Sequence, residues 1–302
     1  MIQSLTTPAS TPASTPFTVR ETCSALGVSE SGFYAHRRKE ERPRRQQDAI
    51  IAREMKEVFD KNYRCYGSPR LVRGLRQRGV RCGKTRIRRL MQQEGISPRQ
   101  KRRVRPRTTH SNPFLPCAPN LLRQLPPVTA PGQRFVSDIT YIPTREGFLY
   151  LAATNEAFTR RCAGWCARDN MESQLVKDAA HMAFATATAS KRVHHSDQGS
   201  QYASEGFRRL LANQEITQSM SRKGNCYDNA LSESFWATVK TECFDNFRAG
   251  IPATKAQAMS ALFQYIELFY NRERLHSALN YRSPIQFEQD WANQDFTDNV
   301  ST

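Results

Sequence analysis

The chain has 302 residues, of which 45 are lysine or arginine and 28 are aspartate or glutamate, for a net charge of +17. This length suits two or three domains with a sizeable core. No apolar run approaches the roughly 18 residues of a membrane span, and no secretory signal is evident, so we expect neither. The eight cysteines form no CxxC pair, which favours reduced thiols in a cytoplasmic, nucleoid-associated protein over a zinc site or a disulfide framework.

The basic surplus lies in one segment. Between His36 and Arg107, 25 lysines and arginines stand against 7 acidic residues, whereas the remainder carries 20 and 21. Such a segment indicates a module that binds a polyanion, and its many arginines suit bidentate contacts with phosphate or guanine. A merely solvated basic face, or a surface for anionic membranes, is the alternative.

The first 45 residues divide into two parts. Residues 1–16 repeat serine, threonine and proline, so we expect a disordered tail. In residues 17–45, apolar positions at helical spacing end at Gly27, and Ser29 is placed to cap a second helix. This pattern predicts a helix-turn-helix, with an ordinary helical hairpin as the alternative.

Residues 46–97 predict a basic helical DNA-binding domain of three helices. The first has an apolar stripe of Ile50, Ile51, Met55, Val58 and Phe59. The second begins at Ser68-Pro69, and the third, from Lys84, buries Ile87, Leu90 and Met91. The basic Pro-rich linker, residues 98–131, is expected to be extended and to track phosphates. The predicted DNA contacts of this half are Arg70, Arg73, Lys84, Arg86, Arg88, Arg89, Arg102 and Arg103.

Residues 132–250 read as an α/β domain. We expect strands at 134–142, 148–154 and 160–167 as an antiparallel meander, then a helix at 172–189, a strand at 191–195, a helix at 204–212, a strand at 216–220 and a helix at 228–243. The order β-β-β-α-β-α-β-α is the ribonuclease-H-like arrangement, a mixed five-stranded sheet with flanking helices. Residues 251–302 are expected to form a helical extension.

Three acids stand on separate elements of this domain. Asp138 lies within the first strand, Asp197 just past the fourth, and Glu233 in the last helix. Carboxylates that converge from separate elements can hold two divalent ions for phosphodiester transfer, and hard oxygen ligands favour Mg²⁺ or Mn²⁺ over zinc. Taken singly, each acid is as readily a turn cap or a solvated side chain.

Three further side chains are candidates for DNA contact near these acids. Lys240 lies two helical turns after Glu233 on the same face, although pairing with a neighbouring acid stays open. His195, two residues before Asp197, suits a phosphate or the metal shell, with a structural role in the strand equally open. Gln201 follows in the same motif.

These motifs resemble the transposases of bacterial insertion sequences that have three catalytic acids and a retroviral-integrase-like core. The resemblance rests on Ser-Asp-Ile-Thr-Tyr-Ile around Asp138, His-Ser-Asp-Gln-Gly-Ser-Gln-Tyr around Asp197, Asn-Ala-Leu-Ser-Glu-Ser-Phe-Trp around Glu233, and the run from Tyr270 to Leu279. It implies that the three acids are the catalytic metal ligands, with two Mg²⁺ or Mn²⁺ ions, and that Lys240 contacts DNA. It also implies a second-reading-frame product, with a possible first-frame subunit as partner. Phe135 and Glu156 depart from the residues usual in that family.

The sequence therefore predicts an enzyme that cleaves double-stranded DNA at the ends of an insertion sequence and transfers the 3′-hydroxyl to a target. Synapsis of two ends predicts a homo-oligomer on DNA. A hydrolysis-only nuclease of the same fold and a decayed transposase that acts as a DNA-binding regulator are the alternatives. The basic first third argues against the nuclease, and the presence of all three acids argues against the regulator.

Overall fold

The computed structural model describes residues 17–40, 43–99, 117–122, 124–185, 189, 191–221, 230–247 and 250–300, without the side chains of 37–40, 246 and 294–300. The predicted disordered tail, the predicted phosphate contacts Arg102 and Arg103, and the loop before the Glu233 helix lie outside these residues. The chain separates into two compact units. We call them the helical unit (Met1–Lys61 with Leu71–Ser97) and the sheet unit (Asn62–Arg70 with Pro98–Thr302).

The helical unit begins with the predicted helix, turn and helix. Its helices are α2 (Val19–Ala25), α3 (Glu30–Glu40), α4 (Pro43–Lys61), the main part of α5 (Ser68–Gln77) and α6 (Lys84–Gln93). Gly27 takes the left-handed φ of +67° that ends α2, and the Ser29 hydroxyl accepts the Gly32 N–H at the start of α3. Thr18 and Glu21 form a capping box at the start of α2, so this helix begins where its first free N–H groups find partners.

The predicted apolar stripe of α4 is correct except at one position. Ile51, Met55, Val58 and Phe59 are buried, but Ile50 is 54% exposed. Adjacent residues of a helix point about 100° apart, so Ile50 cannot share the inward face centred on Met55. The predicted α6 core of Ile87, Leu90 and Met91 is confirmed.

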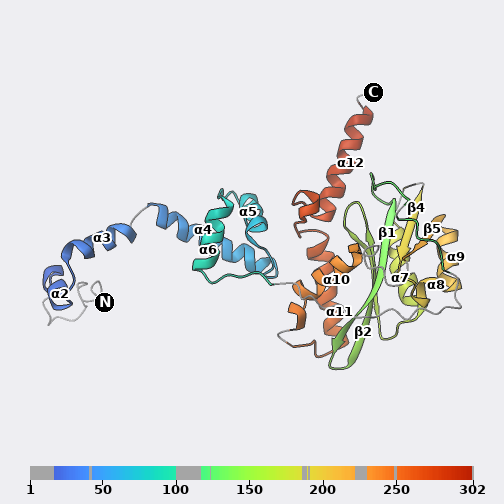
Figure 1. Ribbon diagram of the computed structural model, residues 1–302, viewed down its shortest axis with the longest axis horizontal. Helices are drawn as coiled ribbons and strands as arrows, with labels where there is room; N and C mark the ends of the chain where they lie inside the picture. The colour runs from blue at the N-terminus through green and yellow to red at the C-terminus, as the bar shows by residue number, and fades with distance from the viewer. Residues whose placement is uncertain are drawn as a thin grey trace. The chain divides into compact units, whose positions relative to one another are not determined.

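The sheet unit contains the predicted ribonuclease-H-like sheet (Figure 1). Strands β1, β2 and β3 form the antiparallel meander, and β4 and β5 run parallel to β1, in the order β3-β2-β1-β4-β5. The strands are β1 (Arg134–Thr144), β2 (Gly147–Glu156), β3 (Cys162–Arg168), β4 (Arg192–Ser196) and β5 (Ile216–Met220). The helices of this domain are α7 (Ser173–Phe184), α8 (Ser200–Ala203), α9 (Glu205–Asn213) and α10 (Ala230–Glu242).

Both faces of the sheet are covered. Phe135 and Ala152 join side chains of α7 and α9 in one buried cluster, whereas Leu151 and Ala153, which point the other way from β2, are also fully buried. Helix α7 lies very close to β3 at Gly164, where a Cβ atom would be 2.1 Å from the Ala179 carbonyl oxygen. Only glycine permits this approach.

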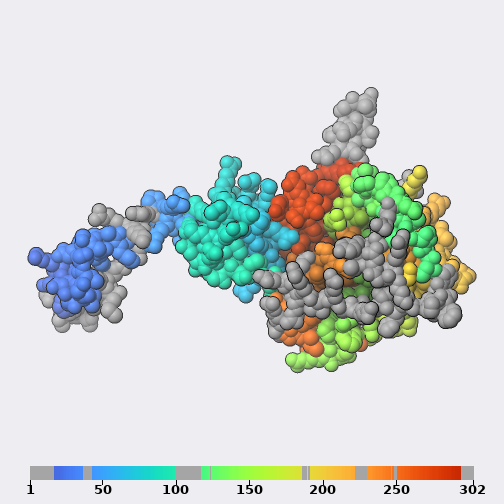
Figure 2. All heavy atoms as spheres, in the orientation of Figure 1, coloured from blue at the N-terminus to red at the C-terminus, as the bar shows by residue number. Residues whose placement is uncertain are grey.

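A helical extension packs against β1 and β2 beside α10 (Figures 1 and 2). It contains η2 (Asp245–Phe247), α11 (Lys255–Phe263), the π-helix η3 (Gln264–Tyr270), η4 (Ser277–Leu279) and α12 (Pro284–Val300). After η3, the Asn271 amide accepts the Cys162 N–H at 3.0 Å and donates to the Cys162 carbonyl at 3.1 Å. This side chain thereby satisfies the backbone at the outer edge of the sheet. None of the helices in the described part of the chain is long and apolar enough to cross a membrane.

Candidate active site

Asp138 and Asp197 lie side by side at the same level of adjacent parallel strands. The register pairs Val136 of β1 with His195 of β4, and two further residues along each strand lead to the two aspartates. Neighbouring strands are about 4.8 Å apart, so the two aspartates are neighbours across β1 and β4. The Gly199 N–H donates to Asp197 Oδ1 at 3.0 Å where the chain turns away from β4.

Helix α10 approaches Asp138 through a tryptophan. Trp236 Nε1 donates to Asp138 Oδ2 at 3.2 Å, and the Ile139 N–H donates to Oδ1 at 2.9 Å. Glu233 lies three residues before Trp236, in the first turn of α10, and its side chain is exposed. Residues three apart are neighbours on a helix surface, so Trp236 brings the Glu233 side of α10 toward β1.

The electrostatics of Asp138 link all three acids. Its pKa is raised to about 7, first because the surrounding protein shields the carboxyl from water, and then because Asp197 and, more weakly, Glu233 disfavour a further negative charge. Hydrogen bonds from Ile139 and Trp236 act in the opposite direction without cancelling this effect. The site therefore holds more negative charge than it stabilises by itself, and a cation would relieve this.

The described residues contain no group of three histidine, cysteine, aspartate or glutamate side chains arranged to hold one metal ion. Asp138 and Asp197 are a pair of hard oxygen ligands, and this donor set fits Mg²⁺ or Mn²⁺. Glu233 is coupled to this pair through its charge but does not join it in one cluster.

Lys240 lies near the same acids. Its ammonium is over the Tyr141 ring, 5.4 Å from the ring centroid. Burial lowers the pKa of Lys240, while the charge of Asp138 acts to raise it. The lysine is therefore half-buried beside the acids instead of lying on a free helix face.

The two histidines before Asp197 are structural. Both are fully buried, and His195 Nδ1 lies 2.9 Å from Ser219 Oγ while His194 Nε2 lies 2.7 Å from Ser137 Oγ. A contact with a DNA phosphate is thus not supported for His195, because its strand position points it into the interior. The half-buried Gln201 donates to the Met171 carbonyl at 2.8 Å.

The predicted basic contacts fall into two groups. Arg73, Lys84 and Arg88 are exposed in the helical unit. Arg86 and Arg89 instead bind the Asp48 carboxylate, at 2.7 and 2.6 Å, and so hold α6 against α4. Arg70, in the sheet unit, is half-buried over the Tyr66 ring.

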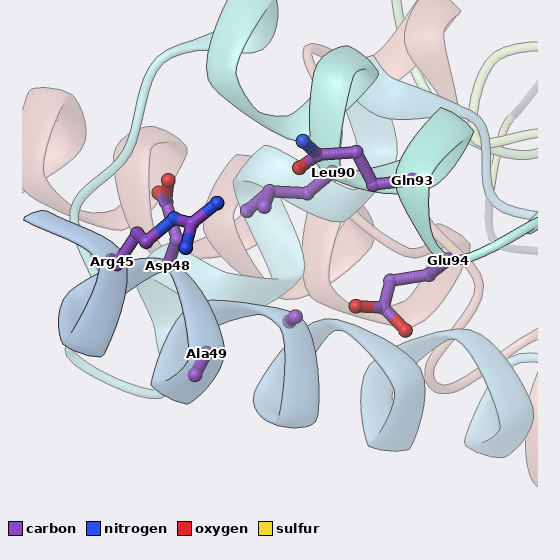
Figure 3. A pocket seen from close by; sticks show the side chains of 7 residues that line it. Arg45, Asp48, Ala49, Leu90, Gln93 and Glu94 are labelled. Carbon is purple, nitrogen blue, oxygen red and sulfur yellow. The ribbon is translucent and has the colours of Figure 1, made fainter. Parts of the chain in front are cut away.

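A shallow hollow of about 280 Å³ between α4 and α6 is a poor phosphate site (Figure 3). Its lining includes Arg45, but also the carboxylates of Asp48 and Glu94.

A buried ion pair, which the sequence analysis missed, holds the far end of α10. Arg274 binds Glu242 in a bidentate arrangement, Nε to Oε2 at 2.6 Å and Nη2 to Oε1 at 2.5 Å, and each side chain is 4% exposed. Tyr265 donates its hydroxyl to Glu242 Oε2 at 2.8 Å. Burial alone would raise the pKa of Glu242, but Arg274 lowers it below its ordinary value. Helix α10, which carries Glu233 and Lys240, is thereby fixed to the helical extension.

Trp236 was also missed as a partner of Asp138. Its place one turn after Glu233 could have indicated this contact, since an indole N–H at that position can donate to an acid beneath the helix. The Arg274 pair had no comparable signal, because its two members are 32 residues apart in the chain.

Three family models match the chain. Two are described as "Integrase core domain", over residues 128–226 and 214–284, and one as "HTH-like domain", over residues 45–104. Among solved structures, the chain is similar to the HTLV-2 integrase catalytic core domain in complex with magnesium (trimeric form), with a TM-score of 0.41 and 14% identity over 53% of this chain and 97% of that one.

Full-length relatives are considerably closer in sequence. The "Insertion element IS600 uncharacterized 31 kDa protein" of Shigella sonnei is 39% identical, over 88% of this chain and 97% of the relative. The transposase for insertion sequence element IS904 of Lactococcus lactis is 36% identical over 82% and 98%, and the transposase InsF for insertion sequence IS3A of Escherichia coli is 34% identical over 90% and 94%. The chain therefore belongs to the family of insertion-sequence transposases that combine an HTH-like domain with an integrase core.

Proposed function

We propose that the chain cleaves DNA at the ends of an insertion sequence and joins the freed 3′-hydroxyl to target DNA, with Asp138, Asp197 and Glu233 as its catalytic acids. The observation that carries the proposal is the alignment of Asp138 with Asp197 across β1 and β4, together with the raised pKa of Asp138. Two carboxylates on adjacent strands, where the charge of Asp197 disfavours ionisation of Asp138, are suited to hold divalent cations.

Asp138, Asp197 and Glu233 would hold two Mg²⁺ or Mn²⁺ ions, which would supply positive charge to activate the attacking oxygen and stabilise the leaving one. The Trp236 N–H keeps Asp138 oriented, so that one carboxylate oxygen is held while the acid binds a cation.

The proposed reaction is two displacements at phosphorus. In the first, a water oxygen attacks the phosphorus at the end of the element, and the 3′-oxygen leaves and takes up a proton. In the second, this 3′-hydroxyl attacks a phosphodiester of the target, and the target's own 3′-oxygen leaves. No covalent enzyme intermediate is required, so the role of the side chains is to position and to balance charge.

The helical unit is proposed to bind double-stranded DNA. Arg73, Lys84 and Arg88 are exposed on α5 and α6, and they are proposed to contact phosphates and base edges. Lys240 is proposed to contact DNA next to the catalytic acids. Assembly of two or more copies on paired ends, with a first-frame subunit as possible partner, follows from the need to bring two ends together.

The test compares Glu233→Gln with Glu205→Gln, an exposed glutamate of α9 that pairs with Arg209. With Mg²⁺ and a duplex that carries the terminal inverted repeat of the element, we expect Glu233→Gln to bind DNA but to lose cleavage and strand transfer. Glu205→Gln should retain both. Wild-type strand transfer by Glu233→Gln would refute the assignment. Cleavage of ordinary duplexes without strand transfer by the wild-type chain would favour the nuclease instead, and DNA binding without either reaction would favour the regulator.

A further inference from the structure

The end of the β1–β2 hairpin carries an exposed aromatic side chain. The rings of Tyr141 and Phe148 meet edge to face, with centroids 4.9 Å apart, and Phe148 is 50% exposed. Lys240 lies over the same Tyr141 ring. We call these three residues the hairpin platform.

The hairpin platform adjoins the proposed catalytic acids. One side of α10 reaches both: Trp236 donates to Asp138, and Lys240, one helical turn later, lies over the Tyr141 ring. A molecule bound on Phe148 and Lys240 would therefore lie beside the reacting phosphate.

The chemistry of the hairpin platform matches a nucleotide. An exposed ring offers a face on which any base can stack, and a cation next to it neutralises a backbone phosphate. Tyr141 supports the Phe148 ring from one side, so Phe148 keeps its orientation while part of it stays open to solvent.

We propose that the hairpin platform is a single-strand subsite, where an unpaired base next to the scissile phosphate stacks on Phe148 while its phosphate pairs with Lys240. This inference rests on the proposed function and goes beyond it, because it assigns the substrate a locally unpaired end. Local strand separation would let the phosphodiester reach the three acids.

The experiment uses the full chain and a duplex of the terminal inverted repeat with a short single-stranded overhang that contains 2-aminopurine. Stacking on Phe148 would quench the fluorescence of this base analogue. We expect Phe148→Ala to abolish the quenching and to weaken binding of the overhang duplex at least fivefold, in keeping with about 1–3 kcal/mol of stacking per base. Binding of a blunt duplex should not change.

Two further variants keep this test decisive. Phe148→Trp should restore the quenching, whereas Phe148→Leu, which keeps an apolar side chain without a ring, should not. Phe263→Ala is the matched control, because Phe263 is 51% exposed on α11. Unchanged quenching and affinity in Phe148→Ala, or an equal loss in Phe263→Ala, would overturn the proposal. If Glu233→Gln abolishes cleavage while Phe148→Ala binds the overhang normally, only the hairpin platform fails. If Glu233→Gln still cleaves, the proposed function fails.

Discussion

The ion pair between Arg274 and Glu242 predicts how the sheet unit responds to the loss of one charge. Arg274→Met removes the guanidinium and leaves the Glu242 carboxylate buried, with Tyr265 still donating to it. Loss of one partner from a buried pair typically costs about 3–5 kcal/mol, because the remaining charge is left without compensation. In a unit of this size each kcal/mol lowers the Tm by about 2–4 °C, so we expect a decrease on the order of 10 °C.

The pH dependence of this loss has a definite sign. Since Arg274 lowers the pKa of Glu242, the pair stabilises the fold above the unfolded-state pKa, and this contribution disappears as pH falls through the folded-state pKa. The deficit of Arg274→Met should therefore be full at pH 7 and should shrink in acid, where Glu242 takes up a proton.

Tryptophan fluorescence can follow this transition selectively. All three tryptophans, Trp165, Trp236 and Trp291, lie in the sheet unit, so thermal unfolding monitored by their emission reports on that unit alone. The double variant Glu242→Leu/Arg274→Met should regain most of the lost stability, because it leaves no buried charge. Arg209→Met, which removes an exposed pair within α9, should cost less than about 1 kcal/mol. A Tm of Arg274→Met within about 2 °C of wild type, or a double variant no better than the single one, would refute the reasoning.

Three other variants test separate parts of the structure. The pKa of Asp138 is about 7 in the fold and near 4 in the unfolded chain, so without divalent ions the stability of the protein should fall as pH rises from 4 to 7. Asp138→Asn should therefore raise the Tm at pH 8 but not at pH 4, and added Mg²⁺ should raise the Tm of wild type only. A Tm of Asp138→Asn equal to that of wild type at pH 8 would contradict this. Gly164→Ala should destabilise the sheet unit by several kcal/mol, since the new methyl would overlap the Ala179 carbonyl, and a soluble variant with wild-type Tm would mean that α7 lies farther from β3. Asp48→Asn should lower the free energy of unfolding of the helical unit by about 1–3 kcal/mol, measured by chemical denaturation followed by circular dichroism. Arg88→Ala should leave this stability unchanged and weaken DNA binding. The reverse pattern would show that α6 is not held by Asp48.

Local patterns were sufficient to predict much of the sheet unit. Strands of alternating or continuous apolar character, separated by short turns, predicted the order of strands and helices along the chain, and β5 was predicted to the residue. Helix α7 ends at Phe184, whereas the sequence predicted an end at residue 189. The alanine-rich sequence contains no clear stop signal from which the end could be predicted. The burial predicted for Ile50 was wrong for a similar reason, since an apolar residue at the edge of a helical stripe can face the core or the solvent.

The proximity of Asp138 and Asp197 could be predicted from the sequence, but the rest of the geometry could not. Asp138 lies within β1 and Asp197 just beyond the end of β4, and the register of the two parallel strands aligns them. His195 is buried although it points to the opposite face of β4 from His194, because both faces of the sheet are covered, and a five-residue strand does not reveal this by itself. The distance of Glu233 from the two aspartates depends on how α10 is seated, and this is set by tertiary contacts such as Trp236 with Asp138 and Arg274 with Glu242.

The stretch Asn62–Arg70 belongs to the sheet unit although it lies within the range of the HTH-like match. Its Tyr63 ring contacts the rings of Tyr265 and Phe269, with centroids 5.2 and 4.7 Å away, and its Tyr66 hydroxyl accepts the Leu275 N–H at 2.9 Å. A protein truncated to begin after Ser97 would thus expose these aromatic rings and leave a buried N–H without its acceptor. For the same reason, recombination between related elements that exchanged the first hundred codons would also replace a piece of the recipient's sheet unit. The two parts of this gene are therefore expected to be inherited together.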